Sequence, residues 1–247
     1  MKRLILSRKG FDSSAGGGPS PILDDGRIFS LPIPQKEKSP HRYSDLKFDE
    51  FNGEDFIKKI KCSVLPETFC HFDPRLDQEI GVFGQANAAQ TELKNRDIQI
   101  GDLFLFFGWF KDYSGYGKDL HHIFGWLQIN KIIEGEKKIK KFLLENNLLH
   151  PHGYKDVSRY KNNTLYIGAK KLSFDEKIFN CNGSGLFKKT HTDLILTEPQ
   201  MTRSNWKLPI DFLSSKNIFL NRLKWHDKKN LKVIYLSLIH ISEPTRR

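Results

Sequence analysis

Apolar residues are concentrated in the middle of the chain, where residues 101–129 read GDLFLFFGWFKDYSGYGKDLHHIFGWLQI. Five consecutive apolar residues occupy positions 103–107, and residues 122–127 form a second run with little polar interruption. A strand with one face in solvent shows alternating apolar and polar positions instead. The pattern therefore predicts two long strands, joined by a glycine-containing loop and covered on both faces, at the centre of the fold.

Weaker patterns predict shorter elements on either side of this pair. Strands are expected at residues 3–7, 164–172 and 191–196, and helices at residues 53–62, 84–94 and 136–147. Prolines at positions 19, 21, 32, 34 and 40 exclude a helix from residues 8–40. That segment still carries regularly placed apolar residues, so we expect an ordered, packed loop with a turn at Asp24-Asp25-Gly26.

Short strands and helices that alternate without strict β-α-β order indicate an α+β fold. We expect a mixed, strongly curved or barrel-like central sheet with a few flanking helices. Residues 1–235 are expected to form a single domain. Residues 236–246 match the translation of a sequencing adapter, so residues 236–247 are interpreted as an artefact and the domain as truncated near Tyr235.

The net charge of +11 favours a polyanionic partner such as a nucleotide or DNA. Lys137, Lys138, Lys140, Lys141, Lys188 and Lys189 lie in short runs that are more typical of solvated surfaces than of an anion site. We expect no membrane association, because no apolar run reaches the ~18 residues of a membrane helix. Three widely spaced cysteines fit a reducing cytoplasm. The sequence leaves the cofactor unknown.

The first candidate site is the loop SRKGFDSSAGGGPS at residues 7–20. Its glycines, with Gly16 and Gly17 at the centre, can turn several backbone N–H groups toward one anion. Arg8 and Lys9 would add charged hydrogen bonds to a phosphate, and Asp12 could act as a base. The alternative is a structural loop whose glycines only permit positive φ angles.

The second candidate is FCHFDPRLD at residues 69–77. His71 and Asp73 can form an acid/base pair. A cysteine, a histidine and an aspartate so close together also suggest a metal, but the spacing matches no common structural zinc pattern, so no metal site is assigned. The structural alternative is that Asp73-Pro74 opens a helix against which Cys70 and His71 pack.

Two further segments carry histidines. In the second central strand, His122 and Trp126 share one face and can contact and stack a base, or can simply belong to the core. The segment His150-Pro151-His152 can ligate a metal or hold a phosphate, and it can equally be an ordered loop.

These segments together resemble one family. SRKGFDSSAGGGPSPI, LPIP, CHFDPRLD, GQANAAQ, GDLFLFFGWF, HHIFGWLQI, LHPHG and NNTLYIGAKKL are similar to the third type of nucleotide modification-associated domain. The resemblance implies a role in making, processing or recognising modified nucleotides in bacteria or phages, without an agreed reaction. Gly18 stands where a cysteine is expected, which argues against a nucleophilic thiol in that loop. Residues 101–129 also loosely resemble PUA-like barrels, the EVE and ASCH domains, which bind modified bases.

We therefore expect a single site between the 8–20 loop, the 71–73 loop and the rim of the central strands. A pocket there would bind a modified nucleotide. The alternatives are a reader of modified bases without catalysis and an accessory subunit of a DNA modification or defence system, so the sequence leaves enzymatic activity open. The expected catalytic residues are Asp12, His71 and Asp73. The expected substrate and phosphate contacts are Ser7, Arg8, Lys9, Ser13, Gly16, Gly17, Gln85, Gln90, Trp109, His122 and Trp126.

Overall fold

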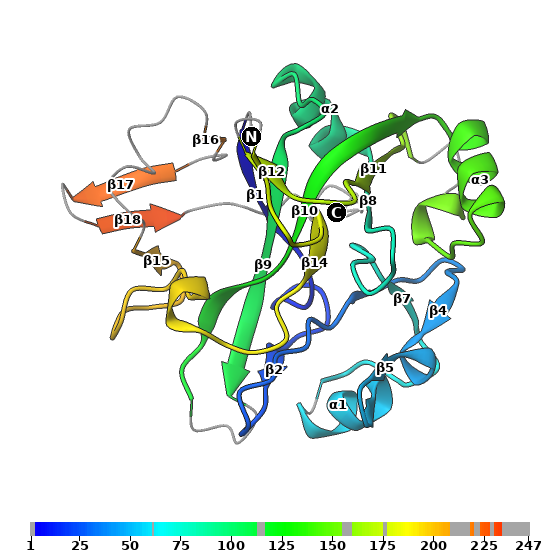
Figure 1. Cartoon of the computed structure of the whole chain (residues 1–247). Helices are drawn as coiled ribbons and strands as arrows, with labels where there is room; N and C mark the ends of the chain where they lie inside the picture. The colour runs from blue at the N-terminus through cyan, green and yellow to red at the C-terminus, as the bar shows by residue number, and fades with distance from the viewer. Residues whose placement is uncertain are drawn as a thin grey trace, which may run out of the picture.

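The two central strands dominate the computed structural model (Figure 1), which describes residues 3–60, 62–112, 117–154, 160–174, 177–207, 218–219, 223–227 and 230–233. Strand β9 (Leu103–Asp112) pairs antiparallel with β10 (Leu120–Glu134). The register places His122 opposite Gly108 and is interrupted by an irregularity between Ile123 and Gly125. The predicted strand pair is confirmed.

Both faces of β9 are buried, as the continuous apolar run predicts. Phe104 and Phe106 belong to one core cluster, and Phe107 belongs to another. In the first cluster, the ring of Phe83 meets those of Phe104 and Phe106 edge-on, with centroids 4.9 and 5.0 Å away. Such edge-to-face contacts add to the free energy gained from burying apolar surface.

The main sheet is mixed and open. Its strand order is β16 (Ile218–Phe219), β1 (Leu4–Arg8), β9, β10, β11 (Thr164–Gly168) and β8 (Val82–Gln85), with β2 (Ser20–Ile22) added on β9 and β14 (Ser184–Leu186) on β10. Strands β1 and β2 run parallel to β9, whereas each neighbouring pair in the order β9-β10-β11-β8 is antiparallel. The described strands confirm the α+β class but close no barrel.

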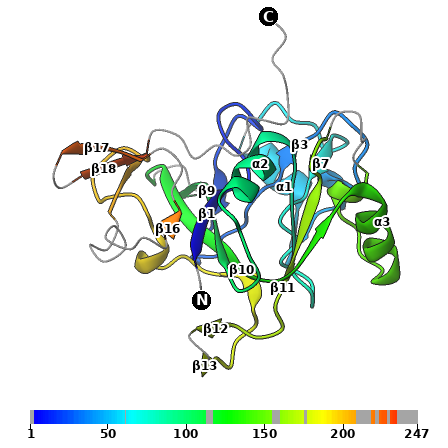
Figure 2. The ribbon, with the colours of Figure 1, turned by 90° about the horizontal axis from the view of Figure 1, so that it is seen from above.

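Three α-helices are described. Helices α1 (Gly53–Lys59), α2 (Asn87–Asn95) and α3 (Glu136–Glu145) confirm the three predicted helices, with ends that differ by a few residues. Ala86, expected inside α2, is its N-cap residue. Helix α3 contacts β10 and β11 and lies at the right in Figures 1 and 2, whereas α1 lies beside the small strand β5 (Lys47–Phe48) in Figure 1.

Residues 8–40, in the segment between β1 and β7 (Phe69–His71), are packed as predicted, with Phe11, Leu23 and Leu31 buried in a separate core cluster. Within it, β3 (Ile33–Pro34) and β4 (His41–Arg42) pair with β7. This small three-stranded sheet carries His71. The remaining elements of the segment are η1 (Tyr43–Asp45), β5 (Lys47–Phe48) and β6 (Phe51–Asn52).

The strand expected at residues 191–196 is wrong. Residues Thr192–Leu194 form the short 3-10 helix η3, because His191 Nδ1 accepts the Asp193 N–H and starts a helical turn. Outside it, Ile195 makes only an isolated bridge to His122. The other short elements are β12 (Ser173–Phe174), β13 (Lys177–Ile178), η2 (Pro151–Gly153), β15 (Asn205–Trp206), β17 (Leu223–Asp227) and β18 (Asn230–Val233).

The proposed artefact at residues 236–247 lies outside the described residues. Among the described helices, none combines the length and apolar character needed to cross a membrane.

Candidate functional site

The end of β1 directs its two cationic side chains to different partners. Arg8 still pairs with Phe107 of β9, and the Lys9 N–H donates to the Phe107 carbonyl at 2.8 Å. Successive side chains of an extended chain point to opposite faces. The Lys9 ammonium reaches Asp73, 3.3 Å from Oδ2, whereas the Arg8 guanidinium lies 3.5 Å from Asp12 Oδ2.

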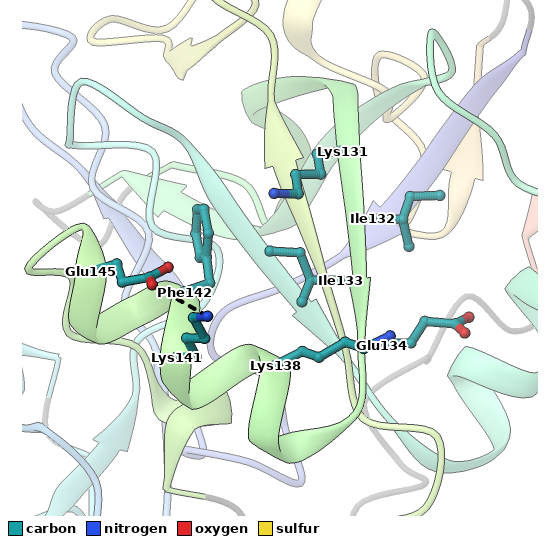
Figure 3. Close-up of a pocket in the computed structure, with 8 residues that line it drawn as sticks. All are labelled: Lys131, Ile132, Ile133, Glu134, Lys138, Lys141, Phe142 and Glu145. Carbon is teal, nitrogen blue, oxygen red and sulfur yellow. Dashed lines mark ion pairs between the residues drawn. The ribbon is translucent and has the colours of Figure 1, made fainter.

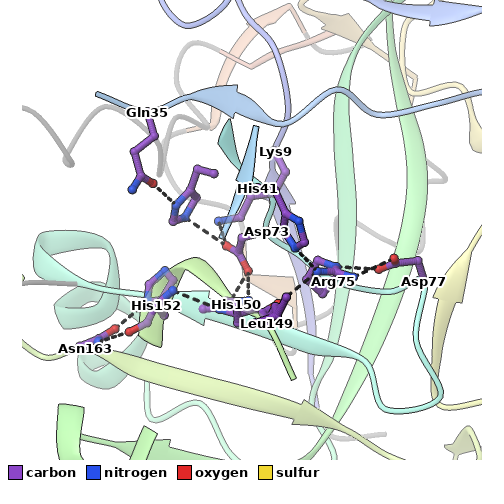
Figure 4. Close-up of polar contacts among 12 residues, drawn as sticks. Lys9, Gln35, His41, Asp73, Arg75, Asp77, Leu149, His150, His152 and Asn163 are labelled. Carbon is purple, nitrogen blue, oxygen red and sulfur yellow. Dashed lines mark hydrogen bonds and ion pairs between the residues drawn. The ribbon is translucent and has the colours of Figure 1, made fainter. Parts of the chain in front are cut away.

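Asp73 is the centre of a buried polar cluster (Figure 4). Its Oδ1 accepts the Gly84 N–H at 2.8 Å and faces His150 Nε2 at 3.0 Å. Its Oδ2 lies 3.3 Å from Lys9 Nζ and 3.8 Å from His71 Nε2. The carboxylate is thus held from several sides by residues distant in sequence.

The charges in this cluster compensate one another. Burial alone raises the pKa of Asp73, but the Lys9 charge and the hydrogen bond from His150 outweigh it and lower this pKa below its ordinary value. Burial lowers the pKa of Lys9, and Asp73 opposes that shift. Lys9 Nζ also lies 4.4 Å from the centre of the Phe83 ring. Asp73 is therefore ionised at neutral pH.

A side-chain amide fixes the tautomer of His71. Gln35 Nε2 donates to the carbonyls of Glu37 and Lys38, each at 3.3 Å, which turns Gln35 Oε1 toward the histidine. His71 Nδ1 lies 2.9 Å from that oxygen and must carry the hydrogen to donate to it. The neutral ring consequently has its lone pair on Nε2, the nitrogen nearer Asp73.

A side-chain amide also fixes the tautomer of His152. Asn163 Nδ2 donates to the His152 carbonyl at 3.0 Å, so Asn163 Oδ1 faces His152 Nδ1 at 2.5 Å and accepts its hydrogen. The lone pair of neutral His152 is again on Nε2. His150 has the opposite tautomer: its Nδ1 accepts the His152 N–H at 3.2 Å, so its Nε2–H donates to Asp73.

Gly84 makes room for the His152 ring. A Cβ atom on Gly84 would lie 2.2 Å from His152 Cδ2, far inside van der Waals contact. Strand β8 thereby supplies both a backbone donor to Asp73 and a space for an imidazole. The sequence shows the His150-Pro151-His152 segment plainly, but no local signal connects it to Asp73.

A cavity of about 640 Å³ adjoins this cluster through Asp73. Its walls are rich in aromatic rings, including those of Trp126 and Phe72. The exposed lysines Lys47 and Lys188 also line it. Aromatic walls, a few polar groups and a volume of ~300–1,000 Å³ are typical of small-molecule sites.

Comparison with known proteins agrees with the sequence motifs. A family model described as nucleotide modification associated domain 3 matches residues 3–234. The chain belongs to this family. No curated protein and no solved structure gives a significant match. The looser likeness to PUA-like barrels stays a prediction.

In this family member, the predicted 8–20 loop packs against the central strands as expected, but its polar groups bond to one another. Asp12 Oδ1 accepts the N–H groups of Ser14 and Ala15 at 2.8 and 2.7 Å, and the Ser14 hydroxyl at 2.7 Å. The N–H groups of Ala15 and Gly17 donate to the Asp12 carbonyl. These N–H groups donate to Asp12 instead of converging on an anion outside the loop, as the sequence predicts they would. Ser13 is exposed, and Gly16 packs on the Phe11 ring.

Most of the residues predicted to contact a base are instead buried in the protein interior. His122 is fully buried, with Nδ1 2.6 Å from the Ile123 carbonyl and Nε2 2.9 Å from the Thr190 hydroxyl. Gln90 accepts the Tyr166 hydroxyl at 2.9 Å, and Gln85 and Ser7 are buried.

The two predicted stacking residues differ. Trp109 donates to Asp119 at 2.9 Å and lies under the Arg203 guanidinium, 4.0 Å away, while Trp126 donates to the Asn182 carbonyl at 2.9 Å and lines the cavity. Of the predicted site residues, the described cavity lining includes Asp73 and Trp126. The suggestion that Asp73-Pro74 opens a helix is wrong: the chain after Pro74 instead forms a bridge between Arg75 and Val82.

A second hollow, of about 630 Å³, lies between β10 and α3 (Figure 3). It contains none of the predicted site residues. Lys141 and Glu145 form an ion pair at 3.7 Å there, and Lys131 Nζ lies 5.7 Å from the Phe142 ring. Its lining consists of lysine, glutamate and apolar side chains, so this family member offers more chemistry at the Asp73 cavity.

Proposed function

We propose that this member of the family binds a modified nucleotide in the cavity beside Asp73 and processes it there. The observation that carries the proposal is that Asp73 belongs both to the buried cluster and to the cavity lining. Family membership supports the proposed substrate class, and the cavity supports the proposed location.

The cavity walls suit the parts of a nucleotide. A base can stack on an aromatic ring with little dependence on its identity, and Trp126 is the largest such ring in the lining. Its indole N–H is held by the Asn182 carbonyl, which fixes the plane of the ring. Lys47 and Lys188 can pair with phosphate oxygens where the cavity meets solvent.

The cluster beside the cavity can move and stabilise charge. Asp73, with its lowered pKa, is a weak proton acceptor at neutral pH, so we assign it an orienting and electrostatic role. His71 carries its lone pair on Nε2, so this nitrogen can accept a proton. Lys9 and His150 would hold Asp73 in place during the reaction.

The test combines binding with product analysis. Mononucleotides with plain and modified bases are titrated by calorimetry into the protein and into Trp126→Ala, with Trp109→Ala as the matched control. We expect affinity to fall at least tenfold only in Trp126→Ala. The same nucleotides and modified DNA are incubated with the protein and analysed by mass spectrometry, with Asp73→Asn as the inactive control.

The outcomes separate the three classes of function. A product that Asp73→Asn does not form supports the proposal. Binding without a product identifies a reader of modified bases, and a steep loss of DNA affinity with salt would point to a polymer as its ligand. Failure to bind any nucleotide overturns the proposal and favours an accessory subunit.

A further inference from the structure

Three potential metal ligands meet beside the cavity. One ligand atom each from His71, Asp73 and His152 lies within 4.8 Å of the others. The three residues come from β7, from the chain just after it and from η2, so the fold and not local sequence brings them together. The rings of His71 and His152 lie 5.3 Å apart.

The surroundings of the two histidines are those of metal ligands. Ligating histidines generally donate one ring N–H to an oxygen acceptor, which fixes the tautomer and leaves the other nitrogen to bind the metal. Gln35 and Asn163 provide this acceptor at the Nδ1 of His71 and His152. Both amides are themselves oriented by backbone carbonyls, and Gly84 N–H orients the carboxylate.

We propose that His71, Asp73 and His152 form a binding site for a divalent transition-metal ion. Two imidazole nitrogens and one carboxylate oxygen are a ligand set used for catalytic zinc and for non-haem iron. Metal–ligand bonds of about 2.0–2.2 Å, at the tetrahedral or facial angles of such sites, place the ligand atoms ~3.0–3.6 Å from one another. Ligand atoms that lie up to 4.8 Å apart therefore have to approach one another by roughly 1–2 Å to bind an ion.

Lys9 competes with the metal for the same oxygen. Its ammonium lies 3.3 Å from Asp73 Oδ2, the carboxylate oxygen that also faces His71. A positive charge at this distance opposes the binding of a second cation. Removing the charge of Lys9 should consequently strengthen metal binding, whereas a cluster with a purely structural role predicts no such change.

Asp73 belongs both to this ligand cluster and to the cavity lining. An ion bound here would therefore place a polarised water or hydroxide at the edge of the cavity. This site does not depend on the proposed nucleotide function. Metal binding can be measured with the ion alone, so its failure and the failure of nucleotide binding are separate results.

The experiment uses the metal-stripped full chain. Zn²⁺ is titrated by calorimetry and Co²⁺ by visible absorption, which reports the nitrogen and oxygen ligands directly. We expect one ion per chain, at least a tenfold loss of affinity in His71→Gln and in His152→Gln, and at least a threefold gain in Lys9→Met. His191→Gln is the matched control, since His191 is an exposed histidine that also lies beside a carboxylate, Asp193.

Folding is checked by circular dichroism for each variant. Should His152→Gln not fold, His71→Gln, at a partly exposed side chain, keeps the test decisive. The proposal is overturned by an absence of Co²⁺ absorption in the folded wild type. It is equally overturned by affinities that fall as much in His191→Gln as in His71→Gln.

Discussion

Lys9 Nζ and Asp73 Oδ2 lie 3.3 Å apart, although the residues are separated by 64 positions in the chain. The contact joins the end of β1 to the segment that follows β7, and both side chains are almost completely buried. It positions the carboxylate that His150 and Gly84 contact from the other side. This ion pair thus links the main sheet to the segment that follows the small β3-β7-β4 sheet.

Breaking this pair from one side should be costly. In Lys9→Met, the Asp73 carboxylate stays buried without its cation, and such a loss typically costs ~3–5 kcal/mol of unfolding free energy. The double variant Lys9→Met/Asp73→Asn removes both charges and should recover more than half of that loss. Urea unfolding of the two single variants and the double variant measures the coupling. Additive losses in the double variant would show that the two charges do not depend on each other.

Gly84 should tolerate no side chain. In Gly84→Ala, the new Cβ would lie 2.2 Å from His152 Cδ2, so the ring or the strand has to move, at a cost of ~1–3 kcal/mol. Gly18→Ala is the control, because a Cβ there meets only Ile60 Cδ1, at 3.9 Å. Thermal unfolding should show a clearly lower Tm for Gly84→Ala than for Gly18→Ala. Equal Tm values would mean that His152 is not tightly held.

The strands with strong hydrophobic patterns could be predicted from the sequence. The contacts that bring the site residues together were less predictable. Continuous apolar runs identify β9 and β10, since only strands covered on both faces carry them. The sequence also pointed to His71 and Asp73. It did not join them to His150, because that contact spans 77 positions and depends on how β8, β11 and the small sheet are arranged.

The separation of Arg8 from Lys9 has a simple physical cause. The expected strand stopped at residue 7, which left both cations on a loop free to converge. In the structure β1 continues through Arg8, and the Lys9 N–H still bonds to β9. Side chains alternate between the two faces of a strand. An error of one residue in the predicted end of a strand therefore changes which face, and which partner, a side chain such as that of Lys9 reaches.

Acid should destabilise the protein through its buried histidines. His121 accepts the Trp206 indole N–H at 2.9 Å, and burial, with Arg8 and Arg203 nearby, holds its pKa well below the ordinary value. The unfolded chain takes up this proton near pH ~6.5 while the folded chain does not, so stability falls as pH drops below ~6.5. Each such group contributes a slope of up to about 1.4 kcal/mol per pH unit until its folded pKa is reached.

His121→Gln isolates this effect, since glutamine can still accept from Trp206 but does not titrate. Urea unfolding from pH 7 to pH 5 should give a slope smaller by about one proton than that of the wild type. Ser13→Ala, at an exposed position without a titrating side chain, should leave the slope unchanged. The pKa values of His41, His122 and His150 are also lowered by burial, so part of the slope should persist in His121→Gln. An unchanged slope in His121→Gln would show that His121 is protonated alike in both states.

Asp12 provides the sharpest test of which carboxylate carries out chemistry. Its Oδ1 accepts two backbone N–H groups and the Ser14 hydroxyl, and it lies outside the described cavity lining. Asp12→Ala leaves those donors without their acceptor, so we expect a loss of ~1–3 kcal/mol in unfolding free energy, against almost none for Ser13→Ala at the exposed neighbour. Nucleotide affinity and product formation, measured well below the Tm of the variant, should remain within about twofold of wild type. A loss of turnover at unchanged stability would instead assign the reacting carboxylate to Asp12, and the site would then lie on the Arg8 side of the sheet and not at Asp73.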